Sequence, residues 1–433
     1  MKRTALAALQ AWKQQKRRKP LIIRGARQVG KTWLMKELAR TSYESFVYLN
    51  FEENVVMQSL FTNDFDIRRI LSTIRLFSGV NPEADKTLLI FDELQEAERG
   101  LTALKYFYEN APQYHVVAAG SMLGIALHPG AAFPVGKVEL LDLYPLTFCE
   151  FLDALGETRF ANLLQNRDWD IIKTFKTKLS ELLKQYCFVG GMPEAVASFA
   201  VNRDFAEVRK IQQEILFAYE QDFSKHAPNE LVPRIRLVWN SIPAQLAKEN
   251  RKFVYGALKQ GARAKEFELA IAWLTDCGLL HKVNRVAKPA LPLKAYEDFS
   301  AFKLFFLDVG LLGAMAMLDA KALLEKIRIF EEFKGALTEQ YVLQQLKASK
   351  DLSLYYWSAE RSEGEIDLLA QHRNEIIPIE VKAAENLHAK SLAAFVKKYA
   401  PRRAVRASMS DYREEEWLTN LPLYAVEQLT AIG

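Results

Sequence analysis

The sequence predicts an α/β protein whose amino-terminal part is a parallel β-sheet covered by helices. Short apolar runs alternate with helix-forming stretches from residue 21 to about residue 146. A glycine-rich loop follows the first apolar run, and an acidic pair follows a later one. Strands separated by helices require right-handed crossovers, so this order indicates a parallel sheet with helices on both faces. The expected strands are residues 21–24, 46–51, 88–92, 116–120 and 138–143.

The loop after the first apolar run has the phosphate-binding pattern G-x-x-x-x-G-K-[ST]. Its glycines let backbone N–H groups surround a phosphate, its lysine reaches the outer phosphates, and its threonine hydroxyl can bind Mg²⁺. The helix that follows directs the positive end of its dipole at the same anion. We therefore expect ATP and Mg²⁺ as cofactors. The expected nucleotide-binding residues are Gly25, Ala26, Arg27, Gln28, Val29, Gly30, Lys31 and Thr32.

A buried strand ending in a carboxylate should accompany such a loop, and residues 88–92 supply one that ends in Asp92 and Glu93. Asp92 is expected to hold the metal together with Thr32. Glu93 is expected to polarise the attacking water, and this adjacent acidic pair favours an ATP hydrolase over a small-molecule kinase. The alternative interpretation is a strand that simply ends in acidic residues facing solvent.

The next buried strand, residues 115–120, is followed by Ser121. Here the chain resembles the AAA+ ATPases, in which the corresponding strand ends in a polar residue that senses the γ-phosphate. The resemblance implies that Ser121, with Lys31 and Glu93, belongs to the catalytic residues. A serine at the end of a strand is also common as a helix cap or turn residue, which is the alternative for Ser121.

Length and composition indicate a soluble globular protein. The chain has 433 residues, a net charge of +5 and half of its residues hydrophobic, which allows about two to four domains. Cys149, Cys187 and Cys277 lie far apart, so neither a disulfide framework nor a zinc site is indicated, and a reducing cytoplasm is expected. We expect no membrane segment. The basic residues at 13–19 are interpreted as a solvated helix end or as a contact to nucleic acid.

Helical patterns predominate after the sheet. Residues 150–226 are expected to form a helical lid, with a helix restarting at Pro193 after a Gly-Gly turn. Several helices followed by strands at 279–283 and 301–307 have the order of a winged helix at residues 227–322. Lys259, Arg263 and Lys265 could touch DNA phosphates there, although winged helices also serve as protein contacts.

A second group of charged residues is expected near the carboxyl terminus. Two apolar segments, residues 364–370 and 376–382, are separated by a short polar turn and predict adjacent strands. Alternate residues of a strand share a face, so Asp367, Glu380 and Lys382 should meet. Two carboxylates are the minimum for binding Mg²⁺, and a neighbouring lysine can orient water or offset charge at a scissile phosphate.

This spacing resembles the PD-(D/E)XK nuclease superfamily, with Asp367 as the first acid and Glu380-Val381-Lys382 as its E-x-K motif. Glu339, on the preceding helix, matches the extra acid of many members. The resemblance implies metal ligation by Glu339, Asp367 and Glu380, and catalysis by Asp367, Glu380 and Lys382. Two alternatives remain for this region: a nuclease scaffold without cleavage, or acids that merely line the edge of a sheet.

Nearly the whole chain resembles a group of prokaryotic AAA+ family ATPases with a carboxyl-terminal domain of unknown function. The resemblance implies an ATPase core at 1–149, a lid at 150–226, a winged helix at 227–322 and a nuclease-like domain at 323–433. It further implies that nucleotide state positions a module acting on DNA, and it leaves open whether the protein forms a homo-oligomer. The alternative is a nucleotide-controlled interaction switch with an inactive nuclease fold. One departure is Gly136-Lys137, where the family usually has Gly-Arg. The departure matters because lysine lacks the planar fork of guanidinium.

The motifs that carry this resemblance are Gly25 to Thr32, Asp92-Glu93-Leu94-Gln95, Ala119-Gly120-Ser121, Leu143 to Glu150, Gly190-Gly191-Met192-Pro193, Phe306 to Leu311 and Glu380-Val381-Lys382.

Overall fold

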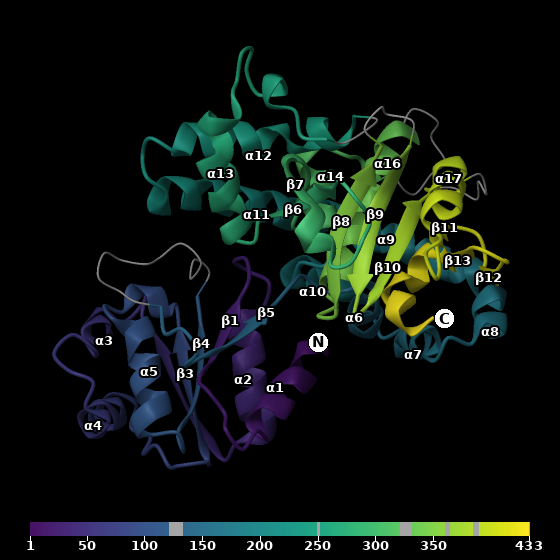
Figure 1. The fold of residues 1–433 in the computed structure, drawn as a ribbon. Coiled ribbons are helices and arrows are strands. Elements are labelled where there is room, and N and C mark those ends of the chain that lie inside the picture. The colour runs from purple at the N-terminus through teal and green to yellow at the C-terminus, as the bar shows by residue number, and fades with distance from the viewer. Residues whose placement is uncertain (121–132, 249–251, 321–330, 360–363, 384–388, 433) are drawn as a thin grey trace. The chain divides into compact units, whose positions relative to one another are not determined.

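The computed structural model divides the chain into two compact units (Figure 1). The amino-terminal unit comprises Met1–Tyr144 together with Asp276–Gly278, and the carboxyl-terminal unit comprises Pro145–Thr275 and Leu279–Gly433. The structure describes residues 1–120, 133–248, 252–320, 331–359, 364–383 and 389–432.

The amino-terminal unit contains a five-stranded sheet in the order β2-β3-β4-β1-β5, with every neighbouring pair parallel. The order explains the alternation in the sequence, because each parallel neighbour is reached through a helical crossover. All five expected strands are confirmed to within one residue at either end. The strands are β1 (Leu21–Arg24), β2 (Ser45–Asn50), β3 (Thr87–Asp92), β4 (His115–Ala119) and β5 (Glu139–Asp142). The helices are α1 (Ala5–Lys13), α2 (Lys31–Ser42), α3 (Val55–Gln58), α4 (Ile67–Ser78), η1 (Leu94–Glu96) and α5 (Gly100–Asn110).

The central strands of this sheet are buried along their whole length, because helices cover both of their faces. Every residue of β3 and β4 is buried, including Asp92 at the carboxyl end of β3. One core cluster joins Phe91 of β3 to Ile70 of α4 and Leu104 of α5. Burial on both faces accounts for the continuous apolar runs in the sequence, and Asp92 marks the carboxyl end of one such run.

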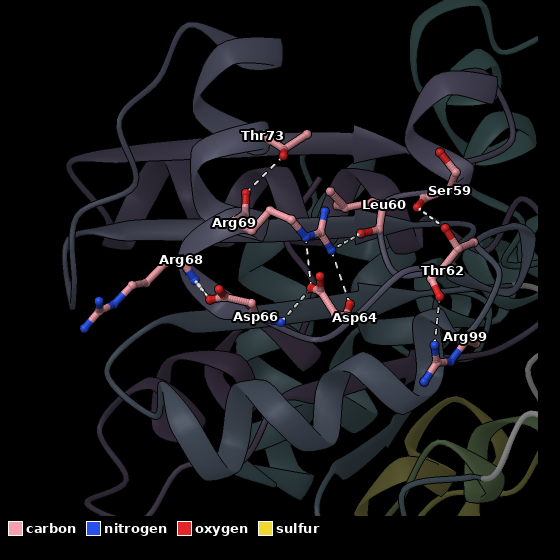
Figure 2. Close-up of polar contacts among 9 residues, drawn as sticks. All are labelled: Ser59, Leu60, Thr62, Asp64, Asp66, Arg68, Arg69, Thr73 and Arg99. Carbon is pink, nitrogen blue, oxygen red and sulfur yellow. Dashed lines mark hydrogen bonds and ion pairs between the residues drawn. The ribbon is translucent and has the colours of Figure 1, made fainter.

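The segment between α3 and α4 is tied to its neighbours by two arginines (Figure 2). The guanidinium of Arg69 donates to Oδ1 of Asp64 at 2.9 Å. Arg99 donates to the backbone carbonyl of Thr62 at 2.8 Å. Its guanidinium also lies 4.2 Å from the ring centroid of Phe65. Arg99 lies six residues after Glu93, so these contacts tie residues 59–66 to the stretch of chain that follows β3.

The carboxyl-terminal unit begins with helices and continues into a mixed sheet. Its helical elements before the first strand are α6 (Phe148–Ala154), α7 (Thr158–Asn166), α8 (Trp169–Thr174), α9 (Lys176–Val189), α10 (Pro193–Asn202), α11 (Phe205–His226), α12 (Val232–Leu246), η2 (Tyr255–Ala257) and α13 (Ala264–Asp276). The predicted helix start at Pro193 is confirmed, with proline at the first helical position.

The second sheet has eight strands in the order β12-β13-β11-β10-β9-β8-β6-β7. Strands β6 and β7 form the antiparallel hairpin expected for a wing, and β6 also pairs in parallel with β8. The hairpin therefore belongs to the same sheet as the carboxyl-terminal strands. The strands are β6 (Leu280–Val286), β7 (Glu297–Phe306), β8 (Leu352–Ser358), β9 (Glu365–His372), β10 (Glu375–Val381), β11 (Val405–Ser408), β12 (Arg413–Glu414) and β13 (Thr419–Pro422). The remaining elements are η3 (Leu293–Tyr296), α14 (Val309–Met315), α16 (Glu331–Lys347), α17 (Lys390–Tyr399) and η5 (Leu423–Ala431).

A buried carboxylate joins the helical part of this unit to the sheet. Asp308, fully buried before α14, accepts hydrogen bonds from the backbone N–H of Gly191 at 2.6 Å and of Leu311 at 3.0 Å. It also accepts one from Nε2 of Gln344, on α16, at 2.8 Å. A Cβ atom at Gly190 would lie 2.0 Å from Oδ1 of Asp308, so the Gly-Gly turn is required for this close approach. The segment expected as a lid is thus built into the carboxyl-terminal unit.

In the part of the chain that the structure describes, no helix combines the length and apolar character needed to cross a membrane.

Candidate functional site

The phosphate-binding loop lies between the end of β1 and the start of α2, as predicted. Gly30 has a φ of 96° and precedes the first residue of α2, Lys31. Gly25 has a φ of 150°, and a Cβ atom there would lie 2.3 Å from the carbonyl oxygen of Leu143. Gln28 also has a positive φ of 64°. These backbone conformations fold the loop over the amino terminus of α2, where unpaired N–H groups favour an anion.

The other loop residues stabilise this conformation through burial and polar contacts. Ala26 and Val29 are buried, and the carbonyl oxygen of Val29 accepts a hydrogen bond from Arg3 at 3.2 Å. Arg27 lies 3.9 Å from Glu52 in a partly exposed ion pair. Arg3, near the amino terminus, therefore helps to hold the loop, although its position in the sequence gives no indication of this role.

The ammonium group of Lys31 lies inside the loop. It donates to the carbonyl oxygens of Gly25 at 2.9 Å and of Ala26 at 2.8 Å. Burial lowers the pKa of Lys31 to about 8, while the nearby charges of Glu93 and Asp92 act in the opposite direction. A cation is thus enclosed by the loop next to two acidic residues, as the phosphate-binding pattern predicts.

Asp92 is the meeting point of three polar groups. Its Oδ2 accepts hydrogen bonds from the hydroxyl of Thr32 at 2.6 Å and from the hydroxyl of Tyr48 at 3.0 Å. Its Oδ1 accepts one from the backbone N–H of Glu93 at 3.2 Å. Burial raises the pKa of Asp92, and the hydrogen bond from Thr32 opposes that effect. A hydroxyl and a carboxylate oxygen in contact suit Mg²⁺, which prefers oxygen ligands.

Glu93 turns away from the strand in a left-handed conformation. Its φ is 48° and its ψ is 48°, which is uncommon for a residue other than glycine. The side-chain amide of Gln95 donates to Oε2 of Glu93 at 2.6 Å. An unusual backbone conformation held by a directed hydrogen bond is typical of functional positions. Neither Gln95 nor Tyr48 was predicted as a site residue, because no spacing rule links them to the acids.

Two further residues were singled out from the sequence near this site, Ser121 and Lys137. Ser121 lies outside the described residues, which in this region end at Gly120 just after β4. The sensor role of Ser121 therefore stays a prediction. Lys137 pairs with Glu109 of α5 at 2.9 Å.

The second predicted group lies on the carboxyl-terminal sheet. Strands β9 and β10 are antiparallel with Leu368 opposite Ile379, so Asp367 and Glu380 are neighbours on one face. The ammonium group of Lys382 lies 2.6 Å from Oε1 of Glu380. Burial raises the pKa of Glu380, and the charge of Asp367 adds to this effect. The structure thus brings Asp367, Glu380 and Lys382 together, as the sequence predicts.

The third acid of the expected metal set has a different surrounding. Glu339, buried on α16, lies 3.9 Å from the ammonium group of Lys303. Within the described ranges, no group of three or more His, Cys, Asp or Glu residues is arranged to hold a metal ion. Metal binding by Glu339, Asp367 and Glu380 therefore stays a prediction. Lys303 was not predicted, because it comes from the distant strand β7.

Comparisons with protein families divide the chain into three segments. Residues 17–152 match a family model described as an AAA domain. Residues 180–322 and 334–426 match two models described as domains of unknown function, DUF8612 and DUF4143.

Individual relatives are distant. An uncharacterized protein of Methanocaldococcus jannaschii, MJ1637, is 26% identical over 200 residues, and the match covers 43% of this chain and 40% of that protein. The Walker-type ATPase PABY2304 of Pyrococcus abyssi aligns with a TM-score of 0.46 and 12% identity, covering 73% of this chain and 95% of that one. The Orc1 protein of Aeropyrum pernix in complex with DNA aligns with a TM-score of 0.28 and 12% identity, covering 72% and 90%.

The family match at residues 17–152 coincides with the parallel sheet, the phosphate-binding loop and the acidic pair after β3. The amino-terminal unit therefore has the fold of an AAA-type P-loop ATPase domain.

Proposed function

We propose that this protein is a Mg²⁺-dependent ATPase whose nucleotide state controls its carboxyl-terminal unit. One observation carries the proposal: Lys31, Thr32, Asp92 and Glu93 converge at the carboxyl edge of the amino-terminal sheet. Ligands bind at this edge in open α/β folds. The residues supply, in one place, a cation for phosphate, oxygen ligands for a metal and a carboxylate for water.

Each residue has a distinct task in this proposal. The loop N–H groups and Lys31 bind the phosphates of ATP, and Thr32 and Asp92 hold Mg²⁺. When bound, Mg²⁺ neutralises charge on the phosphate oxygens. Glu93 accepts a proton from the attacking water, and Gln95 fixes the direction of the Glu93 carboxylate through its 2.6 Å hydrogen bond. ADP and phosphate are the products.

The test is phosphate release from ATP by the purified protein with and without Mg²⁺. We expect hydrolysis that requires Mg²⁺ and that falls to background in Lys31→Ala. An exposed lysine of the same unit, Lys86, provides the matched control, since Lys86→Ala changes the same charge away from the loop. Hydrolysis that is unchanged in Lys31→Ala would contradict the proposed site.

In this proposal the nucleotide state controls the carboxyl-terminal unit, and DNA is the partner of that unit. Lys259 and Arg263 are exposed just before α13 and Lys265 is exposed in its first turn, where their charges could meet a phosphate backbone. In this proposal the segments 150–226, 227–322 and 323–433 act as lid, winged helix and nuclease-like module, and residues 1–149 act as the ATPase core. Stimulation of hydrolysis by single- or double-stranded DNA, and its loss when the three basic residues are replaced by alanine, would support it.

A second candidate function is a nucleotide-controlled interaction switch that does not cleave nucleic acid. The observation that favours it is the pairing of the carboxyl-terminal acids with lysines, Glu380 with Lys382 and Glu365 with Lys303. Acids engaged in this way are less available to a metal. Metal-dependent nicking of plasmid DNA that disappears in Asp367→Ala but survives in Lys31→Ala would instead support a nuclease.

A further inference from the structure

A buried lysine from the wing hairpin reaches the acids of the carboxyl-terminal sheet. The side chain of Lys303, on β7, is 0% exposed. Its ammonium group forms an ion pair and hydrogen bond with Glu365, the first residue of β9, and lies 3.9 Å from Oε2 of Glu339. It also lies 4.9 Å from the centroid of the Tyr356 ring. Lys303 is therefore surrounded by two carboxylates and an aromatic face.

These partners come from separate elements of one sheet and the helix packed on it. Strand β7 forms one edge of the sheet, and β6 and β8 lie between β7 and β9. The ammonium group of Lys303 nevertheless contacts Glu365 of β9, with the ring of Tyr356 on β8 beside it. An ammonium group without water is stable only when acids and hydrogen bonds compensate its lost hydration. The buried charge of Lys303 is therefore stabilised by the two glutamates, and the lysine in turn compensates their negative charge.

Lys382 supplies a second positive charge to the same face, at 2.6 Å from Glu380. The two lysines together carry the charge of one divalent cation. Mg²⁺ would need about six oxygen ligands in near-octahedral geometry. In this structure Glu365 is bonded to Lys303, one oxygen of Glu380 to Lys382, and Oδ2 of Asp367 to the N–H of Val381 at 2.8 Å.

Fitting a divalent cation among these acids would place two further positive charges beside a buried ammonium group. The cost of such an arrangement is high, because the low-dielectric surroundings screen the repulsion poorly. The acids present therefore do not fit the metal that the nuclease resemblance implies.

We propose that Lys303 is a built-in counter-cation of this acidic group, and that the group binds no divalent cation while Lys303 is present. This inference rests on the second candidate function and makes it specific: the carboxyl-terminal unit recognises its partner with a nuclease-like scaffold in which a lysine replaces the metal. It concerns a site separate from the phosphate loop.

The test counts Mn²⁺ ions bound to the full-length, nucleotide-free protein by electron paramagnetic resonance. The wild-type chain and the Asp367→Asn variant are expected to bind the same number of Mn²⁺ ions. Lys303→Met keeps the length of the side chain without its charge, and is expected to gain about one Mn²⁺ per chain that the added Asp367→Asn abolishes. The control is Lys282→Met, an exposed lysine of the same hairpin, which is expected to behave as the wild type.

Two outcomes would overturn the proposal. One is a Mn²⁺ ion on the wild-type chain that is lost in Asp367→Asn, and the other is a folded Lys303→Met variant that gains no ion. If Lys303→Met fails to fold, the comparison of wild type with Asp367→Asn still tests the proposal, because a Mn²⁺ ion that is bound by the wild type and lost in Asp367→Asn would overturn it. Hydrolysis of ATP is measured on the same samples, so failure of the ATPase assignment is seen separately from failure of the lysine assignment.

Discussion

The hydroxyl of Thr32 lies 2.6 Å from Oδ2 of Asp92, although the two residues are 60 positions apart in the chain. This contact joins the phosphate loop to the strand that ends in the acidic pair. It brings the two expected metal ligands together and fixes Glu93 immediately beside them.

Glu93→Gln should separate nucleotide binding from hydrolysis. The amide keeps the shape of the side chain but cannot accept the proton of water, so we expect hydrolysis to fall by about 100-fold or more. ATP affinity should change by less than about threefold, because the loop and Lys31 remain intact. Single-turnover hydrolysis and equilibrium binding measure the two quantities. Glu98→Gln, on an exposed residue of the same segment, is the matched control.

Tyr48→Phe tests whether the hydroxyl that reaches Asp92 positions the metal ligand. Loss of the 3.0 Å hydrogen bond frees Asp92 to rotate, so a several-fold higher Mg²⁺ concentration should be needed for half-maximal hydrolysis. The titration is repeated with Tyr106→Phe, whose ring stacks on Phe65. An unchanged Mg²⁺ dependence in Tyr48→Phe would show that the contact has no role in binding the metal.

Acidification should destabilise the amino-terminal unit through His115. Burial, together with the charge of Arg18, lowers the pKa of His115 to about 4 from its usual value of 6.5. The hydrogen bond to Asp85 opposes this change and Lys13 adds to it, while the hydroxyl of Tyr43 lies 2.7 Å from Nδ1. Between these two pKa values the unfolded chain binds the proton more readily, so stability falls as pH decreases from 6.5 towards 4.

The contribution of this histidine to the free energy of unfolding is up to about 3 kcal/mol, because a tenfold difference in proton affinity between the folded and unfolded chains corresponds to about 1.4 kcal/mol. Urea unfolding of the protein from pH 7 to pH 4 measures it, with His115→Gln as the comparison. The variant should be less stable at pH 7 but should lose less stability on acidification. Parallel pH curves for the two proteins would be the contradictory result.

Asp308→Ala should destabilise the carboxyl-terminal unit strongly. The substitution leaves the buried N–H groups of Gly191 and Leu311 without their acceptor and opens space beside Gly190, so we expect a loss of about 3 kcal/mol or more. Asp308→Asn retains one acceptor oxygen and should lose less. Chemical unfolding followed by tryptophan fluorescence measures both. Equal and small losses, under about 1 kcal/mol, would argue against this carboxylate as a structural link.

The phosphate loop and the first sheet are predictable from the sequence because their signals are local. The loop pattern fixes the positions of Gly25, Lys31 and Thr32 within eight residues of chain. Asp92 follows a run that is apolar because β3 is buried on both faces, which also marks where the strand ends. Asp367 and Glu380 are predictable for a similar reason, since one short turn joins their strands.

The remaining contacts depend on pairings that no local pattern reveals. Tyr48 reaches Asp92 because β2 happens to neighbour β3, and Lys303 reaches Glu365 across the two strands that separate β7 from β9. The β6–β7 hairpin joins the carboxyl-terminal sheet through two paired positions on β6, Arg285 and Val286. Long-range pairing of this kind is decided by tertiary packing and leaves little trace in composition or periodicity.

Calorimetric titration of ATP and ADP into the full-length protein, with Mg²⁺ present, measures nucleotide binding at the phosphate loop. We expect binding of one nucleotide per chain, and no detectable binding to Lys31→Ala at the same concentrations. Absence of binding heat at several temperatures with every adenine and guanine nucleotide tried, on protein shown to be folded, would contradict it. Equal affinity in the wild type and in Lys31→Ala would contradict it as well.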